Sequence, residues 1–363
     1  MIGGGPAART ERLVGELESS ELDCLLVTGR ADLRYLTGFT GSNGLALVGP
    51  DVRLFVTDFR YVEQAATEVG AGYERVQASG PLVGGLAEHL PGRSALRLGF
   101  DDAELTVRAH NRLRDGLPAG VELRSAAGLV KGLRAVKEPA EIQAITAAAR
   151  LADEALEAVL TSGITGRSER ELALALEYEM RTRGAEGVAF APIIAAGPHG
   201  ARPHAEPRDV AVRAGELVVF DWGARVEGYL SDCTRTVAAG EPGAEAREVY
   251  ELVRTAQATG RRAVQAGASA AEVDRQARVV IADAGYGEYF GHGLGHGVGL
   301  EAHESPSLNA RSQDLLEAGN VITVEPGVYL PGRLGVRIED LILVTEGAGE
   351  LLTQLDHQLL IVS

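Results

Sequence analysis

The stretch VVFDWGARVEGYLSDCTRTV, residues 218–237, contains two apolar segments joined by a glycine-containing turn, with Asp221 beside the first and Asp232 beside the second. This pattern predicts a β-hairpin with one acid on each strand. An ionised carboxylate beside a buried strand is costly unless it is paired or binds a metal ion. The hairpin therefore indicates a charged site that needs a partner elsewhere in the chain.

A second stretch of the same kind spans residues 322–344 and carries Glu325 and Glu339. Each stretch follows a pair of amphipathic segments with helical spacing, at 141–184 and 246–285. Two similar helix–helix–sheet units predict an α+β domain with a pseudo-twofold axis, because one unit alone cannot bury the face of its sheet. Such an axis would bring four carboxylates together, and two divalent cations would balance their charge.

The segment GHGLGHGVGLEAHESP, residues 291–306, supplies candidate nitrogen ligands. Its glycines do not fit the dinucleotide-binding spacing, but glycine at every second position suits a strand that another segment approaches closely. We expect His296 to be the fifth ligand. One imidazole among carboxylates suits Mn²⁺, Co²⁺ or Fe²⁺ better than a structural zinc site. His303, and His204 in ARPHAEP, are candidate hydrogen-bond donors to an oxyanion.

The first part of the chain alternates short apolar runs with helical segments, which predicts a small α/β domain. The expected helices span 59–69 and 106–117, and the expected strands span 23–29, 44–49, 52–58 and 94–100. A boundary near residue 128 separates this domain, 1–128, from the second one, 129–363.

The composition excludes several classes of partner. A formal charge of −16 argues against nucleic acid and anionic membranes, and no apolar run reaches membrane-spanning length. The two cysteines, Cys24 and Cys233, fit a reducing compartment, so we expect a cytoplasmic protein. His89, His110 and His357 are assigned to the surface.

These motifs resemble the pita-bread metallopeptidases, a family that includes methionine aminopeptidase, aminopeptidase P and prolidase. The similarity covers roughly residues 130–363, and the preceding α/β domain resembles that of creatinase, prolidase and aminopeptidase P. The matching residues occur in the order of the family: Asp221 in DWG, Asp232 in SDCTRT, His296 in GHGLGHGVGL, Glu325 in VEPGVY and Glu339 in RIED.

The resemblance implies a role for each residue of the site. Asp221 would bind one ion, His296 and Glu325 the other, and Asp232 and Glu339 would bridge them. Glu325 would also carry a proton to the leaving proline nitrogen. The resemblance further implies that His204 and His303 contact the substrate. It places His292 and Arg337 next to the metal ligands, where Arg337 would orient Glu339 through a charge-assisted hydrogen bond. Manganese is the expected ion, with cobalt, zinc or iron as alternatives.

The resulting hypothesis is an aminopeptidase P, which removes the first residue from peptides with proline in second position; RYLTGFTGSNG, residues 34–44, resembles the short bacterial enzymes. Prolidase, which cleaves Xaa-Pro dipeptides, is the alternative. A metal-free creatinase-like hydrolase or an inactive binding protein would be expected to lack ligands, and here all five are present. Methionine aminopeptidase lacks the large first domain. Related enzymes dimerise, so we expect a homodimer.

Overall fold

The computed structural model describes residues 4–92, 95–126 and 128–362. The chain divides into two compact units, Met1–Arg134 and Ala135–Ser363. Helix α5 (Leu129–Ala135) ends at this division, whereas the sequence analysis placed the boundary just before it.

The first unit is an α/β domain around a six-stranded sheet with the order β4-β3-β2-β1-β5-β6. Strand β1 pairs antiparallel with β2 and parallel with β5, so the sheet is mixed. Its strands are β1 (Cys24–Val27), β2 (Gly44–Gly49), β3 (Val52–Thr57), β4 (Glu74–Gln77), β5 (Leu96–Phe100) and β6 (Val121–Ser125). Its helices before α5 are α1 (Pro6–Ser19), α2 (Arg30–Thr37), α3 (Val62–Glu68) and α4 (Val107–Gly116).

The expected α/β class of this unit is confirmed. The four expected strands correspond to β1, β2, β3 and β5, although residue 94 of the last one lies outside the described residues. The two expected helices correspond to α3, preceded by a 3₁₀ turn at Phe59–Tyr61, and to α4. The edge strands β4 and β6 were not predicted, because their side chains are mostly polar and none of them is buried.

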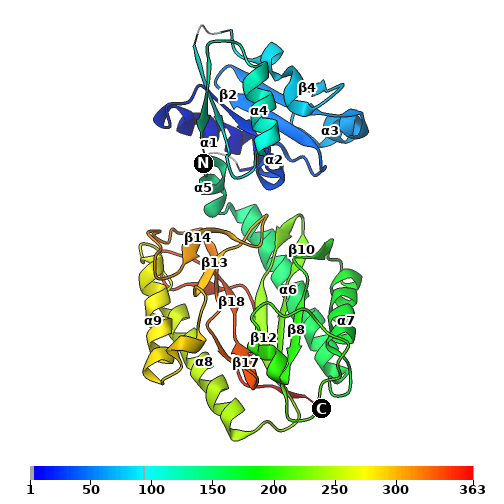
Figure 1. Ribbon diagram of the computed structural model, residues 1–363, viewed down its shortest axis with the longest axis vertical. Coiled ribbons are helices and arrows are strands. Elements are labelled where there is room, and N and C mark those ends of the chain that lie inside the picture. Colours follow the sequence, from blue (N-terminus) through cyan, green and yellow to red (C-terminus); the bar gives the residue numbers. More distant parts are fainter. Residues whose placement is uncertain (1–3, 93–94, 127, 363) are drawn as a thin grey trace. The chain divides into compact units, whose positions relative to one another are not determined.

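The second unit contains two pairs of long helices, as the repeated pattern predicted. They are α6 (Pro139–Thr161), α7 (Glu169–Thr182), α8 (Ala244–Arg262) and α9 (Ala270–Asp283). Helix α6 begins with Pro139, and a reciprocal capping box joins Glu138 to Glu141 at its first turn. Figure 1 shows α7 and α9 at opposite sides of this unit, with strands between them.

Each helix pair covers its own set of strands. The pair α6–α7 packs on a four-stranded sheet with the order β20-β12-β9-β8, and α8–α9 packs on a five-stranded sheet with the order β14-β13-β15-β18-β19. The two sheets comprise β8 (Ile193–Ala196), β9 (Leu217–Trp222), β12 (Cys233–Ala239), β13 (Gly295–Gly297), β14 (Glu304–Leu308), β15 (Val321–Val324), β18 (Asp340–Leu343), β19 (Glu350–Leu351) and β20 (Ile361–Val362). Each half has a large apolar cluster, and a smaller cluster packs α6 and β11 against residues of the later half. The expected repeated α+β architecture is confirmed.

Short strands connect the halves of each hairpin. Strands β10 (Ala224–Val226) and β11 (Tyr229–Leu230) lie between β9 and β12 and form a small sheet with β7 (Gly187–Val188). Strands β16 (Gly327–Leu330) and β17 (Leu334–Arg337) lie between β15 and β18. No helix within the described residues has the length and apolarity needed to cross a membrane.

Candidate metal centre

The first hairpin positions two of the predicted acids. Asp221 lies within β9 and pairs with Thr234 of β12 across the antiparallel ladder. Asp232 directly precedes β12 rather than lying in a strand, because β10 and β11 interrupt the hairpin between the two acids. Side chains alternate along a strand, so Asp221 and Thr234 face one side while the neighbouring Trp222 and Cys233 enter the core beneath α6 and α7.

The second hairpin repeats this arrangement, with both acids at strand ends. Glu325 directly follows β15, and Glu339 directly precedes β18. The expectation of one acid on each strand is therefore met only by Asp221. The Glu339 N–H donates to the Thr234 carbonyl at 3.0 Å, and this bond joins the second hairpin to the first.

His296 lies on strand β13, between β14 and β15, as the glycine pattern predicted. A Cβ atom at Gly295 would overlap the Thr323 carbonyl oxygen, and one at Gly297 would overlap that of Ser305, so only glycine permits these neighbours. Imidazole Nδ1 donates to the Gly297 carbonyl at 3.0 Å. That bond fixes the ring so that Nε2 faces the acids, where loss of its proton would free a lone pair for a metal ion.

The structure brings the five predicted ligands into one group. Nε2 of His296 lies 3.4 Å from Glu325 Oε1 and 3.8 Å from Asp232 Oδ2. One potential ligand atom from each of Asp232, His296 and Glu339 lies within 4.8 Å of the others. Asp221 is close enough to Asp232, His296 and Glu325 for their charges to interact.

Burial makes the charge of this group costly. It raises the pKa of Asp232 and of Glu339 well above their ordinary values, and the neighbouring carboxylates add to both shifts. Burial also raises the pKa of Asp221, although Arg337 opposes the shift. For Glu325, the hydrogen bond and charge of His296 outweigh burial and lower the pKa. Repulsion among these acids is the condition that bound divalent cations would relieve.

The donor set fits such ions. Oδ1 of Asp221 is buried and accepts no hydrogen bond from any described residue, which leaves a carboxylate oxygen available as a ligand. Four carboxylates and one imidazole suit Mn²⁺ and related ions.

Arg337 occupies a different place from the one expected. Its Nη2 donates to Asp221 Oδ2 at 2.5 Å and its Nε donates to Thr234 Oγ1 at 3.0 Å. The Thr234 hydroxyl donates in turn to Glu339 Oε2 at 2.6 Å. The expected direct bond from Arg337 to Glu339 is therefore wrong, because Thr234 lies between them. Thr234 was missed by the sequence analysis, although its position two residues after Asp232 puts it on the same face.

His292 belongs to the same polar network. Its Nδ1 donates to the Gly293 carbonyl at 2.8 Å, so Nε2 accepts from the Tyr329 hydroxyl at 3.0 Å. Tyr329 in turn accepts from Arg337 Nη1 at 2.8 Å. Burial lowers the pKa of His292, which favours the neutral ring that this chain of bonds requires.

His303 lies beside the candidate ligands, with its ring 4.1 Å from the ring of His296. Burial lowers the pKa of His303, and the nearby His296 and His204 add to the shift. His204 is exposed. A neutral His303 retains one N–H donor for a substrate oxygen.

His357, which was assigned to the surface, is instead half-buried. Its Nε2 lies 2.6 Å from Oδ2 of Asp340, a fully buried acid next to Glu339. Nothing near His357 in the sequence indicates this partner.

Both units of the chain match families of known proteins. Residues 143–346 match the family described as metallopeptidase family M24, and residues 9–136 match the creatinase/prolidase N-terminal domain. The "Uncharacterized peptidase YqhT" of Bacillus subtilis is 41% identical over 94% of this chain and 96% of its own.

Two solved structures are similar over almost the whole chain. A Xaa-Pro dipeptidase from Bacillus anthracis has a TM-score of 0.94 and 39% identity, covering 99% of this chain and 100% of its own. An X-Pro aminopeptidase from Thermotoga maritima has a TM-score of 0.88 and 35% identity, covering 98% and 100%.

Proposed function

Since the chain belongs to metallopeptidase family M24 and is a metal-dependent peptidase, we propose that it is a Xaa-Pro dipeptidase, a prolidase. It would hydrolyse the bond between the first residue and the proline of a dipeptide. The observation that carries this choice is the similarity, over nearly the whole of both chains, to the Bacillus anthracis structure named for that activity. Prolidase was the alternative in the sequence analysis and now takes precedence over aminopeptidase P.

We assign metal binding to the five grouped side chains, with Asp232 and Glu339 shared between two ions. These residues are Asp221, Asp232, His296, Glu325 and Glu339. We propose Mn²⁺ as the native ion. Two such ions supply Lewis acidity that activates water near neutral pH.

The protein side chains would then transfer the proton and stabilise the oxyanion. The Xaa–Pro bond is a tertiary amide, and its nitrogen leaves as a secondary amine that needs a proton. Glu325 Oε1, held by His296 and by a 3.3 Å bond from the Thr323 hydroxyl, would take a proton from the attacking water and pass it to that nitrogen. His303 and His204 would donate hydrogen bonds to the oxygen of the cleaved carbonyl.

A second candidate, aminopeptidase P, is favoured by the similarity to the Thermotoga maritima structure. The two activities differ in whether proline carries a free carboxylate or continues the peptide. We extend the proposal to a cytoplasmic location, since both cysteines are buried and neither forms a disulfide. The homodimer remains a proposal from the family resemblance.

The test compares Ala-Pro, Ala-Pro-Ala and Ala-Ala as substrates of the Mn²⁺-loaded protein. Faster hydrolysis of Ala-Pro supports the dipeptidase, and faster release of alanine from Ala-Pro-Ala supports the aminopeptidase. Equal cleavage of Ala-Ala would contradict proline specificity. Glu325→Gln should abolish turnover, while Glu346→Gln, an exposed matched control, should not change it. No hydrolysis by a protein shown to contain metal would overturn both candidates.

A further inference from the structure

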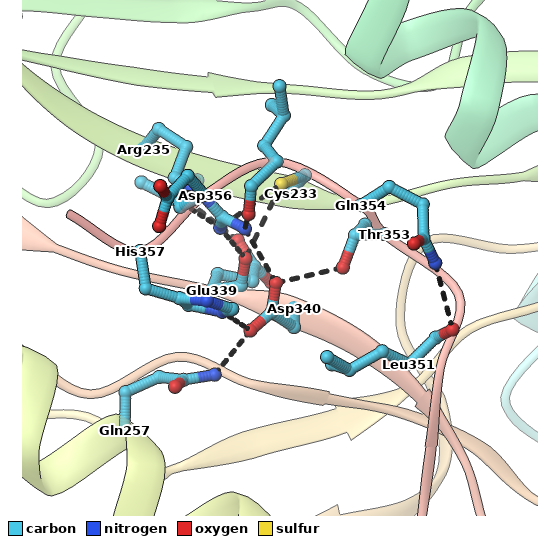
Figure 2. Close-up of polar contacts among 12 residues, drawn as sticks. Cys233, Arg235, Gln257, Glu339, Asp340, Leu351, Thr353, Gln354, Asp356 and His357 are labelled. Atoms are coloured by element: carbon cyan, nitrogen blue, oxygen red, sulfur yellow. Dashed lines mark hydrogen bonds and ion pairs between the residues drawn. The ribbon is translucent and has the colours of Figure 1, made fainter. Parts of the chain in front are cut away.

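Figure 2 shows a buried charged network around Asp340 that includes Arg235, Gln257 and His357. Along β12, Thr234 faces the ligands, whereas Arg235 points toward the helices, as strand alternation requires. Along the second hairpin, Glu339 faces the ligands and Asp340 faces Gln257 of α8. Arg235 and Asp340 form an ion pair of 2.7 Å, with side chains only 4% and 0% exposed.

Every oxygen of the Asp340 carboxylate has two donors. Oδ1 accepts from Arg235 and from the Thr353 hydroxyl at 2.9 Å, and Oδ2 accepts from Gln257 and from His357. A buried ion pair usually adds little net stability compared with apolar side chains of the same size. A network with all its hydrogen bonds made does hold its members in one arrangement.

Arg235 connects this network to the backbone of Glu339. Its Nη1 donates to the Glu339 carbonyl oxygen, while the Glu339 N–H donates to the Thr234 carbonyl from the same strand. The Thr234 hydroxyl then donates to the carboxylate of Glu339. Consequently, β12 holds the backbone of Glu339 at both its N–H and its carbonyl, and also holds its side chain.

The C-terminal segment 353–357 completes the network. Thr353 and His357 donate to Asp340, and the carbonyl oxygens of Leu355 and Asp356 accept from Arg235 at 2.8 and 3.1 Å. Two of the four donors to Asp340 therefore come from this segment, and the other two are Arg235 and Gln257. This segment is more than 110 residues from β12 in the sequence, so its contact with the site exists only in the folded chain.

We propose that Arg235, Asp340 and the segment 353–357 are positioning elements for the active site, holding Glu339 so that its carboxylate reaches the metal ions. The inference rests on the metal role proposed for Glu339. It assigns to the C-terminal segment a part in metal binding, although none of its residues is a ligand.

The main test uses Thr353→Val, which keeps the shape of the side chain and removes one donor to Asp340, and Thr353→Ser, which restores the hydroxyl. Thr255→Val on the exposed face of α8 is the matched control, because it also removes a threonine hydroxyl bond. Asp340→Asn is the stronger variant. Fluorescence of Trp222, the single tryptophan, reports folding.

Residues that orient metal ligands typically affect metal affinity or activity by about 10- to 100-fold. We expect Asp340→Asn to weaken Co²⁺ binding by about that factor, to change the visible Co²⁺ spectrum, and to lower kcat with KM within about twofold. Thr353→Val should show the same changes, with a loss of Co²⁺ affinity of about tenfold. Thr353→Ser should have the wild-type affinity, spectrum and kcat. If Asp340→Asn does not fold, the comparison of Thr353→Val with Thr353→Ser tests the proposal.

Wild-type Co²⁺ affinity, spectrum and kcat in folded Thr353→Val and Asp340→Asn would overturn the proposal. An equal change in Thr255→Val would also overturn it, because the effect would then be unrelated to the network. A wild-type protein that binds Co²⁺ but cleaves no Xaa-Pro peptide would contradict the proposed function alone, since the Co²⁺ measurements would still show whether Glu339 is positioned in this way.

Discussion

Lys137 and Glu304 form a buried ion pair whose removal should affect both stability and turnover. Their charged atoms lie 3.1 Å apart, and the side chains are only 1% and 5% exposed. Lys137 precedes α6, and Glu304 directly follows His303. The Glu304 carboxylate also accepts the Glu301 N–H at 3.0 Å, so the pair fixes the loop that presents His303.

Lys137→Met removes the cation and leaves the Glu304 carboxylate buried. Breaking a buried pair from one side costs about 3–5 kcal/mol, and we expect about 3 kcal/mol because the bond from Glu301 remains. The double variant Lys137→Met/Glu304→Gln should lose clearly less free energy of unfolding than the two single variants lose together, since neither charge remains. The coupling energy should be about 2 kcal/mol. The altered loop should lower kcat by about tenfold or more at unchanged metal content.

The measurement is urea unfolding followed by Trp222 fluorescence, which reports only the second unit because Trp222 is the single tryptophan and is fully buried there. Arg150→Met is the control: Arg150 and Glu154 form an exposed pair on α6, and its loss should cost less than about 1 kcal/mol. A cost below about 1 kcal/mol for Lys137→Met, or additive losses in the double variant, would refute the reasoning.

Three further outcomes are expected. His303→Ala should leave the manganese content measured by elemental analysis unchanged and lower kcat by about 10²-fold or more; loss of metal would show that His303 is a ligand instead. Thr234→Val removes the hydroxyl that holds Glu339, so metal affinity measured by calorimetry should fall about 10- to 100-fold. Burial raises the pKa of Asp153 to about 6, above the value near 4 of an unfolded chain. The folded protein therefore holds this proton more tightly than the unfolded chain does. The resulting contribution to the free energy of unfolding is fully present below pH 4 and is lost as the pH rises through 6. Asp153→Asn should accordingly raise the midpoint of unfolding at pH 8 and have little effect near pH 4, whereas an equal effect at both pH values would contradict the assigned cause.

The repeated pattern in the sequence was sufficient to predict the two helix pairs, the two hairpins and the grouping of four acids, and the glycine-rich segment added the imidazole. Each of these depends on local periodicity or on a residue next to an apolar run, which a single sequence displays. The glycines around His296 were informative for the same reason, since their spacing alone indicated a close neighbour.

The hydrogen-bond partners of individual side chains in distant segments could not be predicted in this way. Arg337 was expected to bind Glu339, but Thr234, more than 100 residues earlier, lies between them. Asp340 directly follows the candidate ligand Glu339 in the sequence. Its side chain nevertheless points to the other face of the sheet, because adjacent residues of a strand alternate. His357 looks like a surface histidine because its partner is distant along the chain.

Most of the apolar core of the second unit lies within one half or the other, a smaller apolar cluster joins the halves, and the candidate ligands are divided between them. Asp221 and Asp232 belong to the earlier half, and His296, Glu325 and Glu339 to the later one. Bound ions would therefore act as a non-covalent cross-link between two similar lobes. Loss of the ions would remove catalysis and also loosen the junction of the lobes, so that metal supply and mechanical integrity of the unit are linked.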